Sequence, residues 1–154
     1  MNEQLKPVTV VMADDDLEDC MLARRAFKQS LLANDLRFVH DGEELLAYLR
    51  RRGAYAPPAD APFPGLVLLD LNMPRMNGME ALQEIKSDPA LRRIPIIVLT
   101  TSQAEEDIYR TYDLGVSAFV TKPVTFSSLV AAVRALGTFF LEVVALPTDK
   151  DHGG

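Results

Sequence analysis

Residues that can do chemistry stand at the ends of four predicted strands in this chain. The short apolar run Leu66–Leu69 lies between proline and glycine residues, which is typical of a strand buried on both faces of a parallel sheet. Asp70 follows that run directly, and the other strand ends carry Asp14 with Asp15, Thr100 with Thr101, and Lys122. Because the carboxyl ends of parallel strands meet at one edge of a sheet, we expect these side chains to converge.

Three carboxylates brought together repel one another unless a cation lies among them. Carboxylate and water oxygens suit Mg²⁺, and no cluster of histidines or cysteines points to a softer metal. A carboxylate beside Mg²⁺ is a competent nucleophile toward phosphorus and gives an aspartyl phosphate. Lys122 and the Thr100 hydroxyl would then bond the phosphoryl oxygens. The pattern therefore predicts a site that accepts a phosphoryl group.

Each of these residues also has an ordinary structural interpretation. Residues 14–16 can cap the helix that follows them, and Asp70 can form a turn. Thr100 can be a simple strand-end threonine, and Lys122 can be a solvated surface charge. Taken singly, these interpretations compete with the functional one. Capping does not explain why all four groups fall at corresponding strand ends of one topology, so the set favours a shared site.

The elements that must position these groups alternate along the chain. The predicted strands are 8–13, 36–40, 66–70, 95–100 and 117–121, and the predicted helices are 17–32, 43–52, 79–87, 104–113 and one that begins near Thr125. This alternation predicts a parallel sheet with right-handed crossovers. Five such units give an α/β, flavodoxin-like three-layer sandwich with strand order 2-1-3-4-5. We interpret residues 50–52, three arginines, as a solvated helix end and residues 53–64 as a surface loop.

Composition narrows the function classes. The chain has 154 residues, which suits a single domain, and its net charge of −6 argues against direct binding of nucleic acid. The single cysteine, Cys20, excludes an internal disulfide, fits a reducing compartment, and is predicted to be a small packing residue. No apolar run is long enough to span a bilayer, so we expect a cytoplasmic protein with no membrane partner.

The sequence resembles the receiver domain of two-component response regulators, similar to the chemotaxis regulator CheY, over about residues 8–136. The motifs that carry the resemblance are ADDD at 13–16, LLDLNMPRMNG at 68–78, VLTTS at 98–102 and FVTKP at 119–123. Leu17 stands where many related receivers have proline, Phe119 replaces a common tyrosine, and Asp14 stands where glutamate is also common. None of these departures removes the predicted chemistry.

The resemblance implies a role for each site residue. Asp70 would be the phosphoacceptor, and Asp14, Asp15, Asp70 and the backbone carbonyl of Asn72 would hold Mg²⁺. Thr100 and Thr101 would supply the switch and phosphate-binding hydroxyls, with Phe119 as the switch aromatic and Lys122 as the phosphate-bonding lysine. The Lys122–Pro123 peptide bond would be cis, which proline permits at modest cost.

Beyond the receiver motifs, the chain continues with an apolar segment at about 137–147 and a polar tail at 148–154 that we expect to be disordered. The segment either packs on its own domain or forms a homodimer contact, and we favour the second. The candidate dimer residues are Phe139, Phe140, Val143, Val144 and Leu146. This extension and the proline-rich loop resemble single-domain regulators paired with bacterial phytochrome histidine kinases.

These features predict a stand-alone response regulator that is not an enzyme, apart from taking its own phosphoryl group and losing it slowly to water. A histidine kinase, of the phytochrome type, is the expected donor. Phosphorylation would draw Thr100 and Phe119 inward and repack the surface of the fourth helix, fifth strand and fifth helix. Two alternatives are a Mg²⁺-dependent phosphohydrolase of the haloacid dehalogenase type and a degenerate receiver that serves as an interaction module. The hydrolase requires a second aspartate two residues after its nucleophile, where this chain has Asn72.

Overall fold

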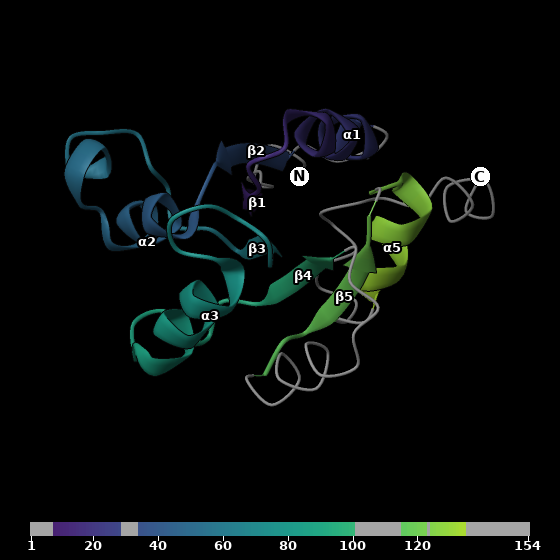
Figure 1. The fold of residues 1–154 in the computed structure, drawn as a ribbon. Helices are drawn as coiled ribbons and strands as arrows, with labels where there is room; N and C mark the ends of the chain where they lie inside the picture. Colours follow the sequence, from purple (N-terminus) through teal and green to yellow (C-terminus); the bar gives the residue numbers. More distant parts are fainter. Residues whose placement is uncertain (1–7, 29–33, 101–114, 123, 135–154) are drawn as a thin grey trace, which may run out of the picture.

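The computed structural model describes residues 8–28, 34–100, 115–122 and 124–134 of the chain. At its centre is a five-stranded, wholly parallel sheet with the order β2-β1-β3-β4-β5 (Figure 1). The strands are β1 (Val8–Ala13), β2 (Asn34–Val39), β3 (Leu66–Asp70), β4 (Ile96–Thr100) and β5 (Ala118–Thr121). The predicted fold class and strand order are confirmed.

Helices cover both faces of this sheet (Figure 1). On one face lie α1 (Leu17–Lys28) and α5 (Phe126–Arg134), which contact each other, and on the other lie α2 (Gly42–Arg50) and α3 (Gly78–Ser87). A short 3-10 turn, η2 (Gly53–Tyr55), follows α2. The arrangement is the three-layer sandwich expected when helical crossovers connect parallel strands.

Two apolar cores result from the alternation of side chains along the central strands. Val11, Leu69 and Val98 point toward α2 and α3, where they pack with leucines of both helices and with Ile85 of α3. Met12 follows Val11, and Leu68 precedes Leu69. Their side chains therefore point to the opposite face of the sheet, toward α1 and α5. All residues of β3 and β4 are buried, which explains why these strands read as unbroken apolar runs.

The register of the strands places the residues predicted to form the site at one edge of the sheet. Ala13 pairs with Leu69, Asp70 pairs with Leu99, and Thr100 pairs with Thr121, so the carboxyl ends of four strands are level. Backbone hydrogen bonds continue past these ends, for example from Lys122 N to the Thr100 carbonyl at 3.1 Å. The side chains that follow each strand are therefore held by sheet backbone.

The second strand and second helix differ from the prediction. β2 runs from Asn34 to Val39, two residues earlier at its start than expected, and α2 ends at Arg50 because Arg51 adopts a left-handed conformation with φ of 54°. Arg50 and Arg51 are not simply solvated, so the interpretation of a solvated helix end was wrong for these two residues, whereas Arg52 is exposed. Arg50 forms ion pairs with Glu84 and Asp88, and Arg51 donates to two carbonyls of the following loop.

Several predictions lie outside the described residues. They include the helix at 104–113, the end of the first helix at 29–32, the extension at 137–147 and the tail at 148–154. Within the ranges given above, none of the helices has the length and apolar character needed to cross a membrane.

Candidate functional site

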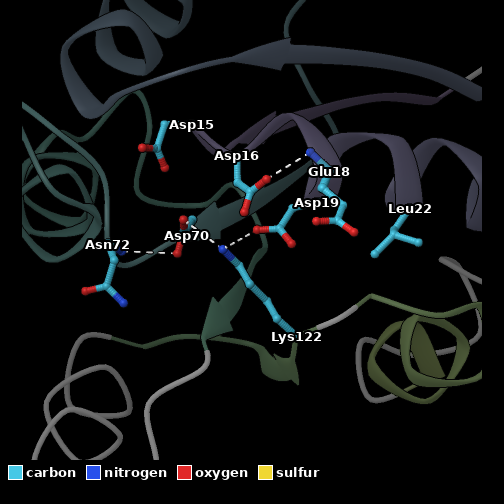
Figure 2. Close-up of a pocket in the computed structure, with 8 residues that line it drawn as sticks. All are labelled: Asp15, Asp16, Glu18, Asp19, Leu22, Asp70, Asn72 and Lys122. Carbon is cyan, nitrogen blue, oxygen red and sulfur yellow. Dashed lines mark hydrogen bonds and ion pairs between the residues drawn. The ribbon is translucent and has the colours of Figure 1, made fainter.

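An open pocket of about 440 Å³ lies at the carboxyl edge of the sheet. Its walls come from the segment after β1, the first turns of α1, the end of β3 and the residue after β5 (Figure 2). The lining side chains are Asp15, Asp16, Glu18, Asp19, Leu22, Asp70, Asn72 and Lys122. The pocket is strongly acidic, and Lys122 supplies the one cation among its lining residues.

The Lys122 ammonium lies among three carboxylates. Its Nζ is 2.7 Å from Asp19 Oδ2, 2.9 Å from Asp70 Oδ2 and 3.1 Å from Asp14 Oδ2 (Figure 2 shows the first two). Burial alone would lower the pKa of Lys122, but the three carboxylates outweigh burial and raise it. Lys122 is therefore charged at physiological pH and neutralises part of the acidic pocket.

Asp14 is fully buried and incompletely satisfied. Its Oδ1 accepts a hydrogen bond from the Asp16 backbone N–H at 2.9 Å, whereas its Oδ2 makes no hydrogen bond with any described residue despite lying near Lys122. Burial is the main cause that raises the pKa of Asp14 to about 7; Asp70 adds to the rise, and the Asp16 N–H and Lys122 oppose it. A buried carboxylate oxygen that shares one ammonium with two other carboxylates can also serve as a ligand to a cation.

The residues present fit a divalent cation. One carboxylate oxygen each from Asp14, Asp15 and Asp70 lies within 4.8 Å of the other two, and Asp15 is exposed so that water can complete a coordination shell. An all-oxygen set with water positions suits Mg²⁺ or Mn²⁺. These three aspartates were predicted from the sequence as metal ligands, and the structure brings them together.

The remaining predicted residues fall into two groups. Asp70 is 2 % exposed, and its Oδ1 accepts a hydrogen bond from the Asn72 backbone N–H at 3.1 Å. Thr100 is buried at the end of β4, and Phe119 is half-buried on β5 against the core on the α2–α3 side. The other predicted positions lie outside the described residues: Thr101, Pro123 with its peptide bond to Lys122, and the dimer candidates Phe139, Phe140, Val143, Val144 and Leu146.

Sequence reasoning missed Asp19. A carboxylate on the first turn of a helix is already accounted for by the helix dipole, but the Asp19 side chain lies closer to Lys122 than either strand-end aspartate does. The neighbouring Cys20 is buried with its Sγ 3.7 Å from the Asp14 carbonyl, and burial above all raises the pKa of its thiol to about 12. Cys20 is therefore an inert packing residue, as predicted.

A clamp outside the pocket fixes the loop that follows Asp70. Arg75, at a φ of 60°, donates from Nε and Nη2 to Asp41 Oδ2 at 2.9 and 2.7 Å. Asp41 also caps α2, because its Oδ1 accepts from the Glu44 N–H at 2.7 Å. The Gly42 N–H donates to the Met76 carbonyl at 2.9 Å, and a side chain on Gly42 would collide with that carbonyl. The β3–α3 loop is thus tied to the start of α2.

We expect Asp41→Ala to lower the free energy of unfolding by about 1–2 kcal/mol through loss of the helix cap. Asp41→Asn is the matched control, because the amide oxygen can still accept from Glu44, and it should cost clearly less. Burial alone would raise the pKa of Asp41, but the Glu44 N–H and Arg75 outweigh burial and lower it. The carboxylate's contribution is therefore present above pH 3.8 and is lost as the pH falls through the lower, folded-state pKa.

Urea unfolding followed by circular dichroism measures both variants. Equal losses for Asp41→Ala and Asp41→Asn would show that the ion pair with Arg75, and not the cap, dominates.

Together the fold and the site define a class: a doubly wound parallel-sheet protein whose carboxyl edge combines an aspartate triad with a buried lysine. The response regulator receiver domain model matches residues 10–134. Because this match covers most of the sequence, the chain belongs to the response regulator receiver family.

Relatives agree with this assignment. The response regulator Rcp1 of Synechocystis sp. (strain ATCC 27184 / PCC 6803 / Kazusa) is 37% identical over 146 residues, which are 95% of this chain and 97% of Rcp1. A structure of Mn²⁺-bound Rcp1 has a TM-score of 0.75 at 38% identity and covers 92% of this chain and 99% of that one.

Two further solved structures are similar. The phosphorylated cyanobacterial phytochrome response regulator RcpA has a TM-score of 0.76 at 41% identity, covering 92% of this chain and 99% of RcpA. The bacteriophytochrome response regulator RtBRR has a TM-score of 0.78 at 40% identity, covering 87% of this chain and 80% of RtBRR. The chain is thus a response regulator of the two-component type, similar to phytochrome-associated members, and receivers of this family are in general signalling proteins rather than enzymes.

Proposed function

We propose that Asp70 accepts a phosphoryl group from the phosphohistidine of a histidine kinase. The observation that carries this proposal is the position of Asp70: a buried carboxylate at the end of the central strand, lining an open pocket, 2.9 Å from the Lys122 ammonium and beside Asp14 and Asp15. A nucleophile at this position meets its donor from the pocket, while the sheet holds its backbone.

The transfer requires one bond to form as another breaks. A carboxylate oxygen of Asp70 attacks phosphorus in line, and the P–N bond to the donor histidine breaks with its electron pair remaining on the imidazole nitrogen. Lys122 holds positive charge next to the incoming phosphoryl oxygens. Asp14, Asp15 and Asp70, with the Asn72 carbonyl, would hold Mg²⁺, which when bound neutralises the negative charge of the phosphoryl group.

We propose that Thr100, Thr101 and Phe119 respond to phosphorylation of Asp70. The Thr100 hydroxyl, at the buried end of β4, and Thr101 would bond phosphoryl oxygens. Phe119, which is half-buried on the neighbouring strand, would follow Thr100 inward and repack the surface around β5 and α5. We also propose that the Lys122–Pro123 peptide bond is cis. In water the aspartyl phosphate would hydrolyse slowly, and the protein would have no other catalytic activity.

The proposed kinase partner is inferred from the similar regulators. Since the similar regulators are described as phytochrome or bacteriophytochrome response regulators, we propose a phytochrome-type histidine kinase as the donor, in the cytoplasm. We also propose a receiver core at about 8–136 and a homodimer through the segment at 137–147. A nucleic acid is not a proposed partner, because the net charge is −6. A membrane is not a proposed partner, because the sequence has no apolar run long enough to span a bilayer.

The competing functions find less support. A haloacid dehalogenase-type hydrolase is not favoured, because the family match and the shared pocket account for Asp70 and Lys122 together. A degenerate receiver would lack a reactive acceptor, and this chain retains the aspartates and the lysine in one pocket.

Intact-mass measurement tests the proposal. The protein is incubated with acetyl phosphate and Mg²⁺, and we expect a gain of one phosphoryl group that is absent in Asp70→Asn. Omission of Mg²⁺ should greatly slow the reaction. A wild-type protein that gains no phosphoryl group, either from acetyl phosphate or from a phosphorylated phytochrome-type kinase, would establish the degenerate receiver instead.

A further inference from the structure

Asp19 is the described residue whose contacts the proposed chemistry does not explain. It lies on the first turn of α1, not at a strand end, and its carboxylate is mostly buried. Its Oδ2 lies 2.7 Å from Lys122 Nζ, the shortest of the three ion pairs made by that ammonium. Asp19 is not a member of the aspartate triad that can hold a metal ion.

The ammonium of lysine has three N–H donors, and three carboxylates lie within ion-pair distance of it here. These contacts are unequal. Asp19 is nearest, whereas Asp14 Oδ2, the farthest, is left without a hydrogen bond among the described residues. Lys122 is therefore shared among the three carboxylates and lies nearest to Asp19 on α1 (Figure 2 shows Asp19 beside the lysine).

We propose that Asp19 is a positioning residue that holds the Lys122 ammonium on the α1 side of the pocket, in competition with the metal-binding aspartates and with the phosphoryl group on Asp70. The phosphoryl part of this inference rests on the proposed function. The metal part rests only on the geometry of the pocket.

Two consequences follow from this competition. By holding Lys122, Asp19 leaves Asp14 and Asp70 more available to a divalent cation. By the same contact it withholds the ammonium from an incoming phosphoryl group, so that phosphorylation proceeds more slowly than the pocket would otherwise permit. Asp19 therefore raises the affinity of the pocket for a divalent cation and lowers the rate at which Asp70 is phosphorylated.

Metal binding tests the first consequence without any phosphorylation. Free Mn²⁺ is measured by electron paramagnetic resonance during titration of the wild type, Asp19→Asn and Asp16→Asn. Asp16→Asn is the charge-matched control: Asp16 lines the same pocket and caps α1 through the Glu18 N–H, which asparagine can also do, and it has no ion pair with Lys122 among the described residues. We expect Asp19→Asn to weaken Mn²⁺ binding about tenfold and Asp16→Asn about twofold.

A double-mutant cycle shows whether Asp19 acts through Lys122. In a Lys122→Met background, Asp19→Asn should weaken Mn²⁺ binding no more than Asp16→Asn does. Circular dichroism of each variant verifies the fold. Equal effects of the two asparagine variants in the wild-type background, or an effect of Asp19→Asn that is unchanged by Lys122→Met, would overturn the proposal.

Phosphorylation kinetics test the second consequence. At saturating Mg²⁺, the second-order rate constant with acetyl phosphate should rise about threefold or more in Asp19→Asn relative to Asp16→Asn. A slower reaction in Asp19→Asn would overturn the competition. If the wild-type protein accepts no phosphoryl group, the proposed function fails, and the Mn²⁺ cycle still decides the role of Asp19 toward Lys122.

Discussion

Gly78→Ala is expected to lower the free energy of unfolding by about 3 kcal/mol or more. Gly78 begins α3, and its N–H donates to the Leu71 carbonyl at 3.0 Å. A Cβ at this position would lie 2.2 Å from the Asp70 carbonyl oxygen and 2.6 Å from Leu71 Cα. Both are backbone atoms at the end of the central strand, which cannot yield as a flexible side chain can. The helix or the strand end must move, and either movement displaces Asp70.

Gly65→Ala provides the matched control for Gly78→Ala. The added methyl group would meet only the Val8 side chain, at 3.0 Å, and should cost less than about 1 kcal/mol. Urea unfolding followed by circular dichroism compares the two variants, because the chain has no tryptophan for fluorescence. Phosphorylation of whatever Gly78→Ala protein remains folded should also be impaired. Equal stabilities of the two variants would show that α3 does not rest on the Asp70 backbone as described.

Patterns that depend on local sequence were predictable here. An unbroken apolar run marks β3 because both faces of the strand are buried, and a parallel sheet places all strand ends at one edge. These two features are sufficient to predict from the sequence that Asp14, Asp15, Asp70 and Lys122 lie together. Proline and glycine near the strand ends gave the approximate boundaries.

Contacts that depend on packing between distant elements were not predictable from the same patterns. Asp19 and Lys122 lie far apart in sequence, and only the placement of α1 over the sheet edge determines that their side chains meet. The helix dipole alone explains a carboxylate in the first turn of a helix, so nothing in the sequence indicated the contact between Asp19 and Lys122. The pairing of Arg75 with Asp41 is similar, since no local signal links one loop to another.

Asp14→Asn is expected to stabilise the metal-free protein at pH 8 by about 2 kcal/mol, even though it removes a proposed metal ligand. The pKa of Asp14 is raised from 3.8 to about 7, chiefly by burial. Between these two values the folded protein binds more protons than the unfolded chain, so the stability of the wild type falls as the pH rises from about 4 to about 7. Above the upper value the carboxylate is ionised in both states and the penalty is constant. Asparagine is neutral throughout and carries no such penalty.

Urea unfolding of both proteins in a chelator, at pH 5 and at pH 8, measures this difference. The Asp14→Asn variant should match the wild type more nearly at pH 5 and exceed it at pH 8. Added Mg²⁺ should reverse the order at pH 8, because a cation bound by Asp14, Asp15 and Asp70 would stabilise only the folded wild type strongly. The Asp14 carboxylate would thus destabilise the metal-free fold, and a bound cation would offset that cost. A wild type more stable than the variant at pH 8 in chelator would contradict this account, because it would mean that the ion pair with Lys122 outweighs the burial of Asp14.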